Sequence, residues 1–158
     1  MAILNLIRID ERLIHGQIVT SWVAKSRANT IVIADDEVYQ DELQCDLLSM
    51  VTPPDIELKI KSVADAAAYI NSPENSHVLL LVKTPGVVNS LIDHGVKLDD
   101  INVGNMGSKS NRTKYATTLW LTDEERNDFN KLLLLGKRVH LQVLPTDSAI
   151  ELSQLLRK

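Results

Sequence analysis

The sequence has a single cysteine, few aromatic residues and no long apolar run. Cys45 has no second cysteine with which to form a disulfide, which fits a protein kept in a reducing cytoplasm. The residues around Cys45 are typical of a helix and none is cationic, so nothing activates the thiol and no catalytic role is expected. Aromatic residues make up only 4% of the chain, and Leu, Ile, Val and Ala supply most of the apolar content.

An excess of positive charge is also lacking, since 17 Lys and Arg face 21 Asp and Glu, a formal net charge of −4. This balance argues against a nucleic-acid binder and against a polybasic protein of the membrane surface. No apolar run approaches the ~18 residues of a transmembrane helix. The segment Met1–Asp10 has neither the basic region nor the cleavage site of a signal peptide. We therefore expect a cytoplasmic protein that is not inserted in a membrane.

Short β-rich runs alternate with helix-like stretches over the 158 residues. Asn29–Ala34 and His77–Val82 are almost wholly apolar, as expected of strands buried on both faces. The other predicted strands are Ala2–Ile9, Ile56–Ile60, Ile101–Val103, Lys114–Leu121 and Val139–Leu144. The predicted helices are Gly16–Lys25, Asp41–Met50, Val63–Ile70, Pro85–His94, a helix from Thr122 to Gly136, and Thr146–Leu156. The alternation predicts an α/β fold in one domain over residues 1–158, a three-layer, doubly wound, mostly parallel open sheet of about six or seven strands with helices on both faces.

Ligands of such sheets bind at the carboxyl ends of the strands. The loop after the first strand is the richest in functional groups, with two arginines, two carboxylates and His15 between Arg8 and Gln17. His15 stands just before a predicted helix, whose free N–H groups and positive dipole end disfavour an imidazolium and favour a bound anion. A neutral imidazole at this position is a nucleophile, and Gly16 lets another molecule approach it closely.

Two neighbours of His15 fit a covalent phosphoryl carrier. Arg12 can donate charge-assisted hydrogen bonds to a bound phosphoryl group, and Asp10 can accept backbone N–H bonds or pair with an arginine. Two simpler interpretations stay open on these residues alone. His15 can be a capping or surface residue, and the charged cluster can be a solvated salt-bridge network that adds little to stability.

The string RIDERLIHGQIVTSW resembles the N-terminal motif of the IIB proteins of the mannose–fructose–sorbose family of the bacterial phosphoenolpyruvate-dependent sugar phosphotransferase system (PTS). The strings LLLVKTP (Leu79–Pro85) and INVGNMG (Ile101–Gly107) also resemble family segments, and the resemblance spans essentially the whole chain. It implies that His15 is phosphorylated transiently, at Nδ1, by a phosphohistidine of a IIA partner. The phosphoryl group then passes to a sugar that the membrane subunits IIC and IID carry inward, so the chain is expected at the transporter's cytoplasmic side.

The resemblance also implies that Asp10, Arg12, Gly16 and Gln17 belong to the phosphoryl-binding loop. Arg8, in the last residues of the predicted strand, is a further candidate for this loop. The loose transition state of phosphoryl transfer needs positioning and positive charge rather than an acid or base. Two partners must also reach the same atom in turn, which a closed pocket would oppose. We therefore expect an exposed His15 on a mobile loop.

Lys83 and Thr84 follow the clearest buried strand and are candidates for binding the phosphoryl group. Lys83 adds charge and Thr84 a hydroxyl donor. The alternative for Thr84 is that it only caps the next helix, with Pro85 in its first turn.

A glycine-containing turn after Ile101–Val103 is predicted to shape the wall of the site through Asn105, Met106 and Gly107. The spacing from Gly104 to Lys109 is not that of a phosphate-binding P-loop, so no nucleotide cofactor is expected. No pair of ligands has the spacing of a metal site either, and His77, His94 and His140 are interpreted as structural. Arg112, Lys109 and Lys114 form either a positive patch for an acidic partner or a solvated face.

Two other classes of function remain open. One is a regulatory module that senses phosphate through the same loop without chemistry, and the other is a small-molecule enzyme with His15 as general base. Neither would form an isolable phosphohistidine. Mannose, fructose, sorbose, glucosamine and N-acetylgalactosamine are all candidate sugars, with a preference for the last from the NVGNM segment. Self-association is also possible.

Overall fold

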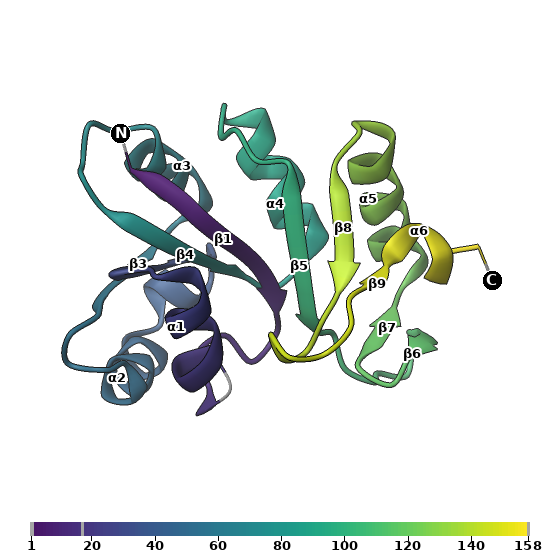
Figure 1. Ribbon diagram of the computed structural model, residues 1–158, viewed down its shortest axis with the longest axis horizontal. Helices are drawn as coiled ribbons and strands as arrows, with labels where there is room; N and C mark the ends of the chain where they lie inside the picture. The colour runs from purple at the N-terminus through teal and green to yellow at the C-terminus, as the bar shows by residue number, and fades with distance from the viewer. Residues whose placement is uncertain (1, 17, 158) are drawn as a thin grey trace.

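The computed structural model describes residues 2–16 and 18–157, and its centre is a seven-stranded sheet of order β3-β2-β4-β1-β5-β8-β9 (Figure 1). Neighbouring strands are parallel except for β9, which is antiparallel to β8. The strands of this sheet are β1 (Ile3–Asp10), β2 (Thr30–Ala34), β3 (Glu57–Lys61), β4 (His77–Val82), β5 (Asp100–Asn105), β8 (Arg138–Leu141) and β9 (Ile150–Glu151).

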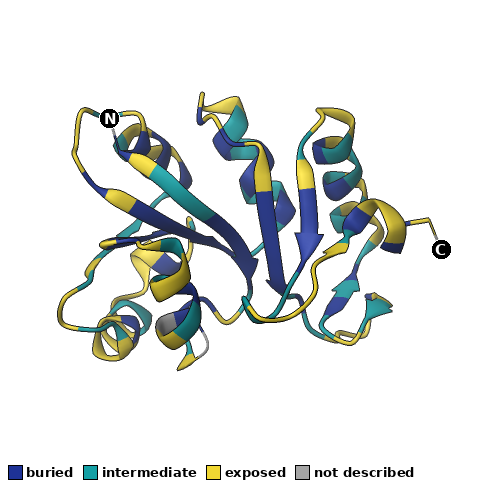
Figure 2. Ribbon diagram, in the orientation of Figure 1, coloured by how far each residue is buried: buried dark blue, intermediate teal, exposed yellow. Residues whose placement is uncertain are grey.

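Helices cover both faces of the sheet, so the predicted three-layer α/β class is confirmed. One face packs against α3 (Val63–Ile70), α4 (Pro85–Asp93) and α5 (Asp123–Leu134). The other packs against the π-helix η1 (Ile18–Trp22), its continuation α1 (Val23–Ser26) and α2 (Glu42–Val51), which a short 3-10 turn, η2 (Val38–Gln40), precedes. Figure 2 shows the central strands almost entirely buried between these layers.

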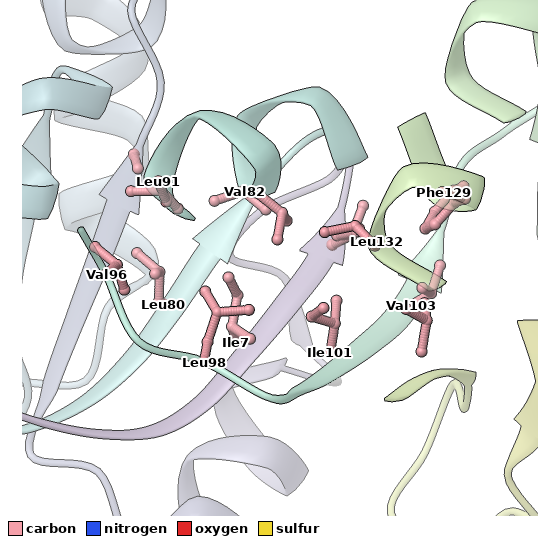
Figure 3. Close-up of a cluster of buried hydrophobic side chains, with 14 of the residues drawn as sticks. Ile7, Leu80, Val82, Leu91, Val96, Leu98, Ile101, Val103, Phe129 and Leu132 are labelled. Atoms are coloured by element: carbon pink, nitrogen blue, oxygen red, sulfur yellow. The ribbon is translucent and has the colours of Figure 1, made fainter. Parts of the chain in front are cut away.

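Two apolar clusters hold the layers together, one on each side of the sheet. The larger fills the space between the strands and α3, α4 and α5. Figure 3 shows part of it, with Leu91 of α4 and Leu132 of α5 among strand side chains such as Ile7 and Ile101. The continuous apolar runs of β2 and β4 follow from this arrangement, because both faces of these strands are covered.

Polar side chains cap several helices and fix where each begins. Asp41 accepts a hydrogen bond from Gln44 N at the start of α2, and Ser62 does the same for Asp65 N at the start of α3. Thr122 and Glu125 form a reciprocal capping box at the start of α5. Each cap satisfies backbone N–H groups that have no partner within the helix.

Two predicted elements are wrong. The predicted strand Lys114–Leu121 is an antiparallel hairpin, β6 (Thr113–Ala116) and β7 (Leu119–Leu121), separate from the main sheet. Its turn is Thr117-Thr118, which carries none of the Gly, Pro, Asn or Asp residues that usually mark turns. The predicted helix Thr146–Leu156 is instead a loop, strand β9 and the short helix α6 (Leu152–Leu155). Pairing of β9 with β8 covers what would otherwise be an open sheet edge.

The first predicted helix begins with π geometry rather than as a regular α-helix. In the described part of the chain, no helix combines the length and the apolar character that crossing a bilayer requires.

Candidate active site

The candidate site lies at the carboxyl end of β1, a central strand of the sheet. The last four residues of β1 are buried, and Ile9 and Asp10 lie beside Val82 of β4 and Asn105 of β5. The chain then leaves the sheet edge and turns back toward η1. The loop that carries His15 therefore emerges at the edge where a doubly wound fold binds its ligands.

Asp10 organises this loop although none of its side chain is exposed. Its Oδ2 atom lies 3.0 Å from His15 Nε2, and its Oδ1 accepts hydrogen bonds from Arg12 N at 3.0 Å and Arg12 Nε at 3.4 Å. The backbone carbonyl of Asp10 accepts a further bond from Leu13 N at 3.0 Å. One buried carboxyl group thus fixes both the backbone turn and the imidazole.

The contact with Asp10 distinguishes the two nitrogens of His15. A carboxylate accepts hydrogen bonds, so Nε2 carries the proton of a neutral ring and Nδ1 keeps its lone pair. The ring is 18% exposed, which is less than predicted, because the Asp10 contact and the buried Leu13 and Ile14 hold the loop against the protein. The Asp10 contact therefore leaves the Nδ1 lone pair free.

The loop also contains strained backbone. Leu13 has a φ of +56°, in the left-handed region, although its side chain is almost completely buried. This conformation costs a β-carbon-bearing residue ~1–2 kcal/mol. Burial of Leu13 in the cluster that holds Ile18 and Trp22 offsets this cost. The loop is therefore set by packing as well as by hydrogen bonds.

Arg8 anchors Asp10 from inside the molecule. Its fully buried guanidinium lies 3.4 Å from Asp10 Oδ2, and it also donates to the Asn102 side chain and to the carbonyls of Gln142 at 2.9 Å and Val143 at 3.0 Å. The cation lies 4.8 Å from the centre of the Trp22 ring. Burial lowers the pKa of Arg8 to about 10, although Asp10 partly opposes this, so the group stays charged at neutral pH.

Gly104 makes room for Arg8. A Cβ atom built on Gly104 would lie 2.1 Å from Arg8 Nη2 and 2.3 Å from Cζ. No real β-carbon approaches other atoms so closely, and the guanidinium is held by several bonds, so it cannot simply move aside. The absence of a side chain at Gly104 is a requirement of the site that the sequence alone does not reveal.

Glu11, next to Asp10, takes no part in the His15 contacts and binds Arg112 instead. Arg112 donates to Glu11 Oε1 at 3.0 Å and Oε2 at 2.7 Å, and on its other side to Glu125 Oε1 at 3.0 Å and Oε2 at 2.7 Å. Burial is the largest single effect and would raise the pKa of both carboxyl groups, but the hydrogen bonds and charge of Arg112, together with backbone N–H bonds from Gly107 to Glu11 and from Thr122 to Glu125, lower both pKa values. Arg112 is buried, so its predicted place on a positive or solvated face is wrong.

The turn after β5 supports the loop through its backbone. Asn105 O accepts a bond from Glu11 N at 3.0 Å, and Gly107 N donates to Glu11 Oε1 at 2.8 Å. Met106 is a core residue with no exposed surface. A phosphoryl contact through the Met106 side chain is therefore ruled out, whereas the interpretation of this turn as a wall of the site agrees with the contacts to Glu11.

Lys83 and Thr84 lie at the same sheet edge, but no hydrogen bond or ion pair of the described residues joins them to His15. Thr84 accepts a bond from Val87 N at 3.4 Å and caps α4, in line with the simpler alternative. Both residues line a cavity of about 290 Å³ together with Asp35, Asp36, Glu37, Val63 and Val87.

Gly16 is exposed, and a β-carbon built on it would meet nothing within 4 Å. Open space thus lies beside His15, while Gln17 is outside the described residues. His140 is buried beside Asp100, and burial lowers its pKa despite this carboxylate. Within residues 2–16 and 18–157, no three His, Cys, Asp or Glu side chains converge as metal ligands.

Comparison with known proteins identifies the family. Residues 4–158 match the family model described as "PTS system sorbose subfamily IIB component". The chain is 34% identical over 152 residues to the sorbose-specific EIIB component of Lacticaseibacillus casei, covering 95% of this chain and 93% of that one. It is 35% identical over 152 residues to the N-acetylgalactosamine-specific phosphotransferase enzyme IIB component 2 of Escherichia coli strain K12, covering 96% and 97%.

A solved structure supports the same family assignment, because it matches this chain in fold as well as in sequence. The IIBSor domain of the sorbose permease from Klebsiella pneumoniae superposes with a TM-score of 0.94 at 28% identity, covering 98% of this chain and 96% of that one. With the family model matching almost the entire length, the chain belongs to the sorbose subfamily of PTS IIB components, which are phosphotransferases.

Proposed function

We propose that the chain, as a single IIB domain over residues 1–158, carries a phosphoryl group on Nδ1 of His15. The group comes from a phosphohistidine of a IIA partner and passes to a sugar during uptake through the membrane subunits IIC and IID. The contact of 3.0 Å between Asp10 Oδ2 and His15 Nε2 is the observation that supports this most strongly. It assigns the proton to one nitrogen and the nucleophilic lone pair to the other.

The proposed step is an in-line transfer between two imidazoles. The Nδ1 lone pair of His15 forms a bond to phosphorus as the N–P bond of the donor phosphohistidine breaks, and the donor keeps that electron pair as a neutral ring. The His15 ring gains positive charge as it attacks, and the Asp10 carboxylate stabilises this charge through Nε2–H. In discharge, the oxygen of a sugar hydroxyl attacks phosphorus as the N–P bond to His15 breaks, Nδ1 recovers its lone pair in a neutral ring, and the hydroxyl proton passes to solvent.

The buried carboxylate does not repel the incoming phosphoryl group because two cations neutralise it. Arg8 and Arg12 both lie 3.4 Å from Asp10 oxygens, so the three groups together carry a net positive charge. The Arg12 side chain is 45% exposed, so its guanidinium is available to a phosphoryl oxygen. Charge-assisted bonds of this kind are the strong ones in anion binding.

The surroundings of His15 suit a site that two proteins visit in turn. Space beside Gly16 admits a donor or acceptor, and we propose that Gln17 also contributes to binding the phosphoryl group. Lys83 adds positive charge at the same edge, and the Thr84 hydroxyl, whose oxygen accepts the cap bond of α4, keeps its proton to donate to a phosphoryl oxygen. We place the protein in the cytoplasm, at the membrane transporter.

The sugar is proposed only as a hexose or amino-hexose. Relatives of similar identity have names that specify sorbose, fructose and N-acetylgalactosamine. The described groups closest to His15 are the carboxylate of Asp10 and the guanidinium groups of Arg8 and Arg12 that contact it, which suit a phosphoryl anion better than a sugar ring. We infer that the choice of sugar is made largely by the membrane subunits.

Labelling with phosphoenolpyruvate and the upstream phosphotransferases tests the proposal. We expect one base-stable, acid-labile phosphoryl group per chain, absent in His15→Ala and retained in the control His77→Ala, which alters an exposed histidine at the opposite end of the sheet. Labelling of His15→Ala would refute the assignment. Failure of the wild-type chain to take up label would favour the phosphate-sensing or general-base alternatives.

A further inference from the structure

Helix α2 carries a row of apolar side chains that face solvent. Leu43 is 70% exposed, Leu47 54%, Met50 80% and Val51 51%, and Tyr39 in the preceding turn is 40% exposed. The helical residues are spaced by four, three and one positions, so they share one side of the helix. Figure 2 shows exposed residues along the outer turns of α2. Leu48, which lies about 100° around the helix from Leu47, is buried. We call these five residues the α2 surface.

The segment of the sequence that contains the α2 surface has acidic residues but no basic ones. Between Ala28 and Leu58 there is no Lys, Arg or His, and the carboxylate residues are Asp35, Asp36, Glu37, Asp41, Glu42, Asp46, Asp55 and Glu57. Glu42 and Asp46 are exposed on α2 itself. Apolar side chains bordered by negative charge complement apolar side chains bordered by positive charge.

We propose that the α2 surface docks a protein segment that presents apolar side chains surrounded by lysine and arginine. A second copy of this chain fits poorly, because a symmetric contact would oppose two acidic borders. An anionic membrane is disfavoured by the same negative charge.

The position of the surface indicates which partner it serves, an assignment that rests on the proposed function. Strand β2 is parallel to β4 and, through it, to β1, so η2 and the start of α2 follow the sheet edge that carries His15. A partner that covers the α2 surface can therefore also reach His15. Cytoplasmic segments of membrane proteins are rich in Lys and Arg, so the membrane subunits have the required chemistry.

Titration of the full-length ¹⁵N-labelled protein with an amphipathic helical peptide of leucine and lysine tests the docking chemistry. We expect the amide signals of residues 39–51 to shift, with an affinity that falls as salt is raised. A matched leucine–glutamate peptide and phosphatidylserine vesicles should not bind. Leu47→Gln should weaken peptide binding at least tenfold, whereas Leu134→Gln, which alters an 89% exposed leucine on α5, should leave it unchanged.

Several results would overturn the proposal. These are no peptide binding, shifts centred away from α2, equal affinity in Leu47→Gln, or binding of the anionic vesicles. A concentration-dependent dimer that Leu47→Gln abolishes would identify a second copy as the occupant instead.

A second readout separates this inference from the proposed function. Leu47→Gln should take up phosphoryl label on His15 as the wild type does, but should show a raised KM when the membrane subunits are the acceptor. Normal transfer to those subunits would refute them as the partner. Loss of labelling in the wild type would refute the proposed phosphoryl-carrier function. The peptide titration would still test the docking surface independently.

Discussion

Asp10 and Glu11 are neighbouring acidic residues, and the structure uses them in opposite ways. Asp10 is buried and holds His15, Arg8 and Arg12 at the end of β1. Glu11 turns away and binds Arg112, which joins it to Glu125 at the start of α5. One charged motif thus supplies both the proposed reactive centre and an ion-pair cluster that supports the adjacent loop, and residue type alone does not tell the two roles apart.

Exchanging each carboxyl group for an amide gives the largest expected contrast. Asp10→Asn removes the negative charge that stabilises the His15 ring during attack, and we expect phosphorylation of His15 to slow by roughly 10²-fold or more. Glu11→Gln should change that rate by less than about threefold, since its contacts support only the loop. Rapid-quench measurement of His15 labelling compares the two variants. Similar slowing in both would contradict the claim that only Asp10 acts on His15.

Gly104→Ala tests whether the buried cation behind Asp10 depends on a missing side chain. The new methyl group would overlap Arg8, so we expect the free energy of unfolding to fall by about 2–4 kcal/mol, with slower His15 labelling in the protein that still folds. Urea denaturation measures the loss. Gly107→Ala is the matched control, because its nearest contact would be an ordinary 3.8 Å, and it should cost less than about 0.5 kcal/mol. Equal stability of the two variants would contradict the packing described here.

Arg112→Met tests whether the Glu11–Arg112–Glu125 cluster stabilises the fold. It removes the cation that Glu11 and Glu125 share and leaves Glu11 only its longer contact of 3.7 Å with Lys109, and because both carboxyl groups keep some contact with water we expect a loss of about 2 kcal/mol. In the wild type the folded-state pKa values of Glu11 and Glu125 are lowered, so their stabilisation is present above the unfolded-state pKa and is lost as pH falls through the folded-state pKa. Denaturation midpoints at pH 7 and pH 3 should therefore differ less in Arg112→Met than in the wild type. An undiminished pH dependence would show that this cluster does not set acid stability.

The smallest effect concerns a strained residue outside both clusters. Arg27 ends α1 with a φ of +58°, so Arg27→Gly should raise the free energy of unfolding by about 0.5–1 kcal/mol and leave His15 labelling unchanged. This variant measures the cost of the left-handed conformation that Leu13 shares, without the loss of a buried side chain. Destabilisation would mean that the Arg27 side chain makes a contribution not evident in its contacts.

Local patterns in the sequence predicted much of the fold. The apolar runs of β2 and β4 and the helical patterns of α3 and α5 each depend on neighbours a few positions away, and these elements lie where the sequence predicts them. The β6–β7 hairpin and β9 were missed, because their pairing depends on tertiary contacts that no turn residue marks.

The same division holds for the site. The motif around His15 predicts a site in this loop because its functional groups are consecutive in the chain, and the structure brings Arg12 and His15 into contact with Asp10. The bonds from Arg8 to the carbonyls of Gln142 and Val143 join residues 134 and 135 positions apart, so no local pattern predicts them. The fit of Arg8 against Gly104 and the φ of Leu13 likewise appear only once the chain is folded.

The most direct test of the central claim is the ¹⁵N and ³¹P NMR spectrum of the phosphorylated protein. The account predicts coupling of phosphorus to Nδ1 of His15, with a proton retained on Nε2 and slowed in exchange by Asp10. In Asp10→Asn that proton should exchange faster. Phosphorus bound to Nε2, or to any residue other than His15, would contradict the account.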